Sequence, residues 1–208
     1  MVKECVFCEY AKKGNERIIY KTKNFFVILP LGCISPGHVM LVSKNHYNAF
    51  GEIPDRLDNE FLDLWNKVHK LCETNFGRIF EFEYGNWGQS VNHAHIHFVP
   101  YKSNDYEIKN AVSEIVSDKI MKINVVWKNV KQIYKKENCY VLFNENGQMI
   151  LINVKGYERS NFPFNSIDVK SFLENKKGLK GIKWQDMGEK DKKDDEKKRK
   201  LTKEKLNF

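Results

Sequence analysis

Histidine alternates with apolar residues in the segment 93–98, which reads His-Ala-His-Ile-His-Phe. Successive side chains of a β-strand point to opposite faces of the sheet, so the imidazoles of His93, His95 and His97 share one face. The apolar residues between them then point into a core. No other part of the chain constrains the fold as strongly, because this pattern requires a sheet with one packed face and one face that carries chemically active side chains.

The residues before this segment predict the rest of such a sheet. Apolar residues at three- and four-residue spacing predict an amphipathic helix over 57–72. Apolar and β-branched runs predict four more strands, at 17–20, 25–30, 38–43 and 80–84. The fold class is therefore expected to be α+β, an antiparallel sheet with a packed helix.

The chain after residue 105 is expected to add a small α+β extension. Asn146-Gly147 predicts a hairpin turn, because both central residues of a tight hairpin turn reach positive φ. The apolar runs predict strands at 123–134, 140–143 and 149–154, and helices at 106–121 and 167–173.

Charge divides the chain into three parts. Residues 1–105 hold 12 basic and 12 acidic side chains, residues 106–188 hold 14 and 9, and residues 189–208 hold 9 and 6. The whole net charge of +8 therefore lies after residue 105. We interpret 1–105 as a first domain and 106–188 as a basic extension. The tail at 189–208 has no apolar period and is expected to be disordered or a frayed, charged helix.

Composition excludes a membrane protein and favours an intracellular one. No apolar run approaches the roughly 20 residues that span a bilayer. The first residues lack the basic and apolar regions of a secretory signal, and the five cysteines do not form a disulfide framework. We expect a cytoplasmic location, or a nuclear one if the source is a eukaryote.

The row of histidines is a candidate catalytic site. Imidazole serves both as a nucleophile and as an acid or base near neutral pH. Gln89 and Ser90, at the entrance to the same strand, offer neutral hydrogen-bond donors to a phosphate oxygen that gains charge. Single histidines on strands are usually structural, and alternating histidines also hold zinc, so a pure metal site is the alternative.

The segment from Gly88 to Pro100 resembles the histidine-triad (HIT) superfamily of Hint- and Fhit-type proteins, whose motif is three histidines alternating with apolar residues after Gly-Gln-Ser. The block 35–46 and the opening Cys-Val-Phe-Cys at 5–8 are also similar to this family, and the resemblance covers residues 1 to about 105. It implies that residues 1–105 form a nucleotide-binding catalytic domain, and that the protein is a nucleotide hydrolase or nucleotidyl transferase that acts at an α-phosphorus.

The resemblance also implies a role for individual residues. His95 would be the nucleophile that forms a nucleotidyl-histidine intermediate, and the carbonyl of His93 would orient its ring. His97, Gln89 and Ser90 would contact the phosphate and its bridging oxygen. Two groups of residues are expected to bind the nucleotide. The loop before the histidine segment contributes Gly88, Gln89 and Ser90, and a candidate apolar base pocket contains Phe7, Phe25, Phe26 and Leu29. Many relatives carry an acidic residue after the second strand, but this chain has none in 28–33.

The cysteine pair suggests a structural zinc. Relatives with this N-terminal pair bind zinc through two cysteines and two histidines, here Cys5, Cys8, His46 and His93. Two thiolates and two imidazoles suit tetrahedral Zn²⁺. The alternatives are a vacant pair of thiols and a histidine that only packs.

Partners beyond a nucleotide remain open at this stage. Residues 155–164, with Gly178, Leu179 and Trp184, faintly resemble the C-terminal extension of CwfJ-type, splicing-associated proteins. The basic, aromatic-containing extension is expected either to bind RNA or DNA or simply to be solvated. The alternative to an enzyme is a weakly catalytic or non-catalytic RNA-associated protein. Family members commonly dimerise, so a homodimer is a further expectation.

Overall fold

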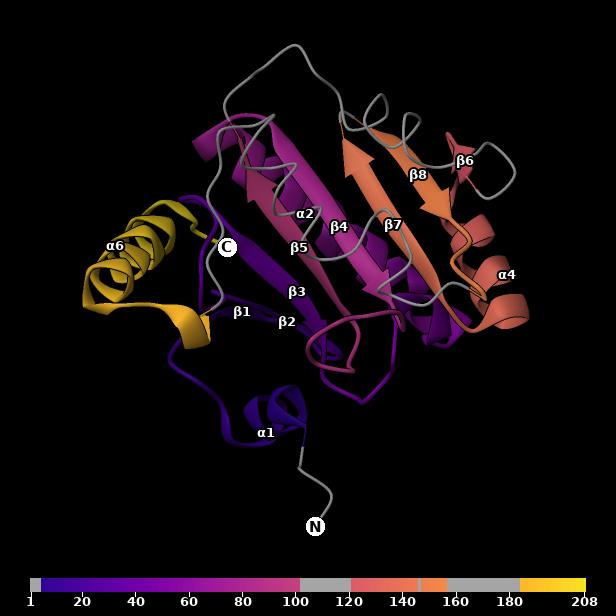
Figure 1. Ribbon diagram of the computed structural model, residues 1–208, viewed down its shortest axis with the longest axis horizontal. Coiled ribbons are helices and arrows are strands. Elements are labelled where there is room, and N and C mark those ends of the chain that lie inside the picture. The colour runs from indigo at the N-terminus through magenta and orange to yellow at the C-terminus, as the bar shows by residue number, and fades with distance from the viewer. Residues whose placement is uncertain (1–4, 102–120, 146, 157–183) are drawn as a thin grey trace.

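An eight-stranded antiparallel sheet forms the centre of the molecule (Figure 1). The computed structural model describes residues 5–101, 121–145, 147–156 and 184–208. The strand order is β1-β2-β3-β5-β4-β7-β8-β6. The bounds are β1 (Ile18–Lys21), β2 (Phe25–Ile28), β3 (Val39–Ser43), β4 (Ile79–Gly85), β5 (His95–Pro100), β6 (Met121–Ile123), β7 (Tyr140–Glu145) and β8 (Gln148–Ile152).

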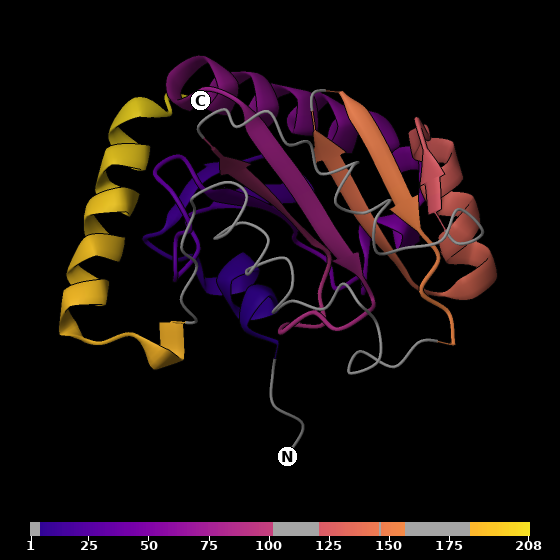
Figure 2. The same cartoon turned by 45° about the horizontal axis from the view of Figure 1, so that its top comes forward.

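Two helices, α2 (Asp58–Phe76) and α4 (Trp127–Glu137), pack on one face of the sheet (Figure 2). Their apolar residues share a core with every second residue of the strands, among them Val27, Leu41 and Ile96. Short 3-10 helices at Phe50–Glu52 and Asp55–Leu57 lead into α2. The helix ends at Gly77, where φ is +89° and the N–H bonds to Glu73.

The other face of the sheet carries the side chains that alternate with this core. Helix α1 (Val6–Lys13) packs Phe7 there against Phe26, Ile28 and Met40. Further along the same face, Phe80, Phe82 and Phe143 form a second aromatic cluster. The predicted α+β class and antiparallel sheet are confirmed.

The extension joins this sheet directly. Strand β7 pairs with β4 over six residues, from Phe80↔Glu145 to Gly85↔Tyr140, and its hairpin with β8 is the one that Asn146-Gly147 predicts. Trp127, Val130 and Tyr134 lie in the same core as Phe61 and other residues of α2. The described residues of the extension therefore share the core of the first part of the chain.

The prediction of a strand over 123–134 is wrong. Only Met121–Ile123 forms a strand, and α4 starts at Trp127. The side chain of Asn129 caps the start of this helix by accepting the N–H of Val126. The buried residues of α4 recur every three or four positions, which is the helical period, so the β-branched composition misled the prediction. The predicted helix at 167–173 and nearly all of that at 106–121 lie outside the described residues.

The tail is a docked, charged helix. Of the two expectations for it, disorder is wrong and the charged helix is present, but it packs on the rest of the chain. Residues Glu189–Lys205 form α6, preceded by a 3-10 turn at Trp184–Asp186, and α6 flanks the β1–β3 end of the sheet (Figures 1 and 2). Pairs such as Lys198–Asp194 and Arg199–Asp195 stabilise it at i,i+4 spacing. It packs through buried polar groups and Leu206, which a search for an apolar period does not detect.

Across the described ranges, no helix has the length and apolar character needed to span a membrane.

Candidate active site

Strand β5 and the residues just before it hold the three predicted histidines. β5 lies between β3 and β4, with Val42 opposite His95 and Met40 opposite His97. His93 precedes the strand and is fully buried, and His95 is 7% exposed. The ring of Phe7 from α1 lies 5.4 Å from the ring of His95, so α1 covers the nucleophile predicted from the sequence.

His95 is held in one tautomer by a backbone contact. Its Nδ1 lies 2.6 Å from the carbonyl oxygen of His93, and a carbonyl only accepts, so Nδ1 carries the proton. The lone pair is therefore on Nε2. Burial lowers the pKa of His95 below its ordinary value, which outweighs the opposite effect of the hydrogen bond, and this keeps the ring neutral.

His97 is held in the opposite tautomer. The backbone N–H of Ile34 donates to His38 Nδ1 at 3.1 Å, so the proton of His38 sits on Nε2. His38 Nε2 lies 3.0 Å from His97 Nδ1, which must accept, and the proton of His97 is then on Nε2. The ring of Phe82 stacks on His97 at 4.4 Å and fixes its plane.

Both rings of this pair are neutral. Burial, followed by the charge of Lys198, lowers the pKa of His38 to about 3. Burial also lowers the pKa of His97, to well below its ordinary value. His38 was not singled out by sequence reasoning, although strand alternation puts it on the face of Met40, which lies opposite His97.

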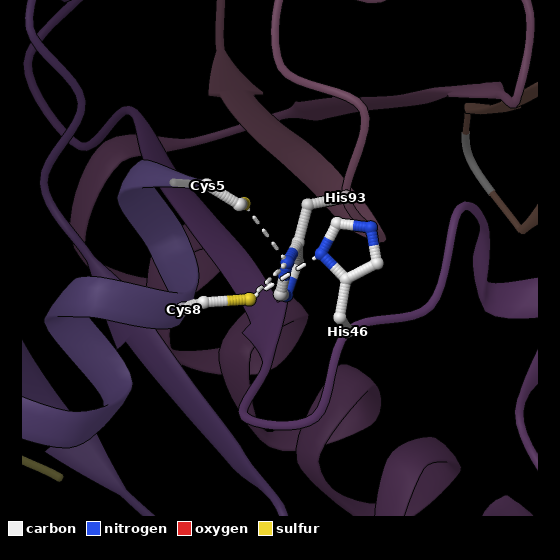
Figure 3. Close-up of side chains that lie close together, drawn as sticks. All are labelled: Cys5, Cys8, His46 and His93. Carbon is white, nitrogen blue, oxygen red and sulfur yellow. Dashed lines mark hydrogen bonds between the residues drawn. The ribbon is translucent and has the colours of Figure 1, made fainter. Parts of the chain in front are cut away.

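The four predicted zinc ligands come together beside the triad (Figure 3). The sulfur and nitrogen atoms of Cys5, Cys8, His46 and His93 all lie within 4.8 Å of one another. Sulfur-to-Nδ1 distances are 3.4 Å for Cys5–His93, 3.6 Å for Cys8–His93 and 3.3 Å for Cys8–His46. The two cysteines come from the start of α1, and His46 follows β3.

These distances fit a tetrahedral metal. With Zn–S near 2.3 Å and Zn–N near 2.0 Å, a tetrahedron separates sulfur from nitrogen by about 3.5 Å. His93 Nε2 donates to the carbonyl of Ser43 at 2.7 Å, so Nδ1 presents its lone pair to the two sulfurs. Burial lowers the pKa of His93 to about 4, which favours the neutral form that ligates a metal.

The family model for the HIT domain matches residues 11–104. Residues 11–104 are a HIT domain. A HIT-like protein of Methanocaldococcus jannaschii is 26% identical over 57% of this chain and 96% of its own length. The bis(5'-adenosyl)-triphosphatase of Dictyostelium discoideum is 33% identical over 43% of this chain and 63% of its own. The crystal structure of a Zn-bound histidine triad family protein from Mycobacterium smegmatis is 22% identical, covers 49% of this chain and 78% of its own, and has a TM-score of 0.42.

The loop before β5 differs from the prediction at Gln89. Gln89 Nε2 donates to the carbonyl of Asn48 at 2.7 Å and to the side chain of Asn92 at 2.9 Å, so both of its protons are used within the HIT domain. Its amide is therefore not a free donor to phosphate in this arrangement. Gly88, at φ +68°, makes the bend that precedes Gln89, and Ser90 is exposed on the same loop.

The predicted base pocket is divided between the two faces of the sheet. Phe25 and Leu29 lie in the main core with α2, so their prediction as pocket residues is wrong: strand alternation directs them away from His95. Phe26 lies on the histidine face but is fully buried under α1. Phe7 alone of these four has a ring contact with His95.

Helix α6 brings polar groups to the loop that follows β2. Asp195 accepts the N–H of Cys33 at 2.6 Å, and the Lys198 ammonium donates to the carbonyl of Cys33 at 3.3 Å. Thr202 Oγ accepts the N–H of Gly37 at 2.7 Å. This is the segment in which the sequence has no acidic residue, and a carboxylate reaches its backbone from 162 positions away. Of the residues with the CwfJ-like resemblance, the structure describes Lys155, Gly156 and Trp184. Lys155 pairs with Glu137 and Trp184 is exposed, while 157–183 lies outside the described residues.

Proposed function

We propose that this chain is a nucleotide hydrolase or transferase that acts at the α-phosphorus of its substrate, with His95 as the nucleophile. One observation carries the proposal: the carbonyl of His93 fixes the proton of His95 on Nδ1 and leaves the lone pair on Nε2. A neutral imidazole in this tautomer is ready to attack without first losing a proton.

The reaction has two displacements at phosphorus. His95 Nε2 forms a P–N bond as the bond between phosphorus and the leaving group breaks. His97, whose proton is on Nε2, donates a hydrogen bond to a phosphate oxygen that gains charge. We assign the same role to the hydroxyl of Ser90, which is exposed on the loop before β5. Water then breaks the P–N bond, which releases a nucleoside monophosphate and restores His95.

Similarity to a bis(5'-adenosyl)-triphosphatase supports a nucleotide substrate. The leaving group is best found with a panel of nucleoside phosphoramidates, dinucleoside polyphosphates and adenylylated nucleic-acid ends. The substrate with the highest kcat/KM then enters the trapping experiment.

Trapping the intermediate tests the mechanism. Full-length protein is mixed with substrate labelled at the α-phosphorus and denatured in alkali, in which a phosphorus–histidine bond survives. Label should remain on the peptide that contains His95 and be released by acid. A Ser90→Ala variant should still take up label, because its nucleophile is intact. Turnover without any label on His95 would contradict the proposed nucleophile.

We also propose that Cys5, Cys8, His46 and His93 hold a structural zinc ion. The fit of the sulfur–nitrogen distances to a tetrahedron supports it. A metal bound there would tie the start of α1 to the residues just before β5, and so hold Phe7 over His95.

A nucleic-acid partner is a second proposal, supported by charge. The net charge of +8 lies entirely after residue 105, and exposed lysines of α6, including Lys193, Lys197 and Lys200, belong to this part of the chain. A polymer that contacts them would release counterions at each phosphate. A mixed set of acidic residues on the same helix opposes this effect, and the salt dependence of binding measures the balance.

A further inference from the structure

Helix α6 has two buried polar side chains in a segment that is mostly charged and largely exposed. Asp195 is 4% exposed and Thr202 is fully buried. Each accepts a hydrogen bond from a backbone N–H of the segment 33–37, which we call the His38 loop. Buried polar groups destabilise a fold unless they are paired, so these two bonds define where α6 docks.

The His38 loop is tightly confined where α6 binds it. Gly37 has φ +85°, and a Cβ at this position would lie 2.6 Å from Phe76 and from Pro100. Glycine is required both by the backbone conformation and by this close approach. Thr202 accepts the N–H of this glycine, so its hydroxyl holds the loop at the residue directly before His38.

The same loop sets the proton position of His38. The N–H of Ile34, which follows Cys33, donates to His38 Nδ1, and His38 Nε2–H then donates to His97. A backbone amide cannot reverse its role, so the direction of both bonds depends on the placement of the loop. The backbone N–H groups on either side of this amide, those of Cys33 and Gly37, donate to Asp195 and Thr202.

We infer that α6, which lies outside the HIT domain, is a positioning element of the active site: through the His38 loop it holds the proton of His97 on Nε2. Asp195 and Thr202 are positioning residues and do not touch the substrate. The inference deepens the proposed function and rests on it for its kinetic consequence, but not for its effect on His97.

The test compares Thr202→Val with Thr202→Ser in the full-length chain. Valine has nearly the shape of threonine but cannot accept the N–H of Gly37, whereas serine can. Glu196→Gln is the matched control, because Glu196 lies on α6, is exposed and makes none of the described hydrogen bonds to the loop. Circular dichroism first establishes that each variant retains its helices.

The first readout is independent of activity. The protein has six histidines, so ¹⁵N-labelled imidazoles can be assigned individually, and the nitrogen shifts report which atom carries the proton. In wild type, Thr202→Ser and Glu196→Gln, His97 should be protonated on Nε2. In Thr202→Val, the shifts of His38 and His97 should move toward a mixture of tautomers.

The second readout is kinetic. Thr202→Val should lower kcat by about tenfold while KM changes less than about twofold, because a proton donor matters more in the transition state than in substrate binding. Serine should restore kcat. A general loss of structure would instead lower the fraction of active protein without changing the tautomer of His97.

A folded Thr202→Val variant with unchanged His38 and His97 nitrogen shifts would overturn the inference. If this variant does not fold, Asp195→Asn and Asp195→Leu give the same comparison, since asparagine can still accept the N–H of Cys33. The His38 and His97 shifts could move in Thr202→Val although wild type turns over none of the nucleotides in the panel. That result would support the role of α6 and refute the proposed function.

Discussion

His95 and His97 are neighbours on one strand and hold their protons on opposite ring nitrogens. Their ring centroids are 5.2 Å apart, the bare Nε2 belongs to His95, and the protonated Nε2 belongs to His97. A backbone group fixes each assignment, the carbonyl of His93 in one case and the N–H of Ile34 in the other. Two identical side chains thereby present a lone pair and a proton at the same ring position, which suits the proposed roles of nucleophile and donor.

Replacing the proposed nucleophile, while keeping its hydrogen bond to the carbonyl of His93, should abolish activity. The side-chain amide of His95→Asn can still donate to the carbonyl of His93 but has no counterpart of Nε2. We expect turnover to fall at least about a thousandfold, with only a small change in melting temperature. Retention of a tenth of the wild-type kcat would exclude His95 as the nucleophile.

Purified protein should contain one zinc per chain. Metal content is measured by elemental analysis in wild type, in Cys8→Ser and in Cys139→Ser. Cys139 lies outside the four-residue cluster, so its variant should keep the metal, whereas Cys8→Ser should lose most of it. A chelator should lower the melting temperature of wild type, because the metal joins α1 to the sheet. Folded, active wild type with far less than one equivalent of metal would refute the zinc site.

Glu83 should make the protein less stable as the pH rises. It is fully buried between Tyr140 and Phe50, and burial raises its pKa to about 7 from 4.5, against the effect of the hydrogen bonds that these residues donate. The folded protein therefore keeps a proton that the unfolded chain releases, and this stabilisation is lost between about pH 4.5 and 7. The free energy of unfolding of Glu83→Gln, relative to wild type, should rise by up to roughly 3 kcal/mol from pH 5 to pH 8.

Glu60→Gln is a control of opposite sign. Hydrogen bonds from Thr22 and Asn24 outweigh the effect of burial and lower the pKa of Glu60. Its contribution is present above the unfolded pKa and lost in acid, so this variant should lose stability relative to wild type as the pH rises from acid to neutral. Urea unfolding at several pH values measures both variants, and parallel curves for them would show that the pKa of Glu83 is not raised.

Neutralising exposed lysines of α6 tests the nucleic-acid proposal. Lys193, Lys197 and Lys200 are changed together to glutamine, which leaves the docking hydrogen bond of Lys198 intact. Binding to single-stranded RNA or DNA should weaken, and the dependence of log K on log salt should become shallower by about 0.7 for each phosphate that the variant no longer neutralises. Turnover of a small nucleotide should be unchanged. Absence of salt-dependent binding in wild type at low ionic strength would leave only the small-nucleotide activity.

The sequence was sufficient to predict what local periodicity and short motifs determine. The alternation around His95 places the histidines on one face, and the helical spacing from Leu57 predicts α2. The zinc ligands follow from resemblance rather than from pattern, since His46 lies 38 residues from Cys8. The distances between the four donor atoms were available only from the folded chain.

Contacts that connect distant parts of the chain were not predicted. Helix α6 has no apolar period, so composition alone suggested disorder or a frayed helix, whereas Thr202 and Asp195 dock it through hydrogen bonds to backbone groups about 165 residues away. The tautomer of His97 depends on Ile34, whose side chain has no part in it. Almost every residue has the same backbone N–H donor, so a sequence does not indicate which of these donors will set the tautomer of a histidine.

The pairing of β7 with β4 determines which edges of the sheet are available to pair with a second copy of the chain. Both edges of β4 are hydrogen-bonded, one to β5 and the other to β7, so the described sheet ends in the short strands β1 and β6. A second copy cannot join through β4 to make a continuous intermolecular sheet. A protein cut after residue 105 would expose that seven-residue edge together with Phe80 and Phe82, and unpaired apolar edges recruit strands from other molecules. The extension therefore covers this edge of β4, and its removal should promote self-association of the truncated protein.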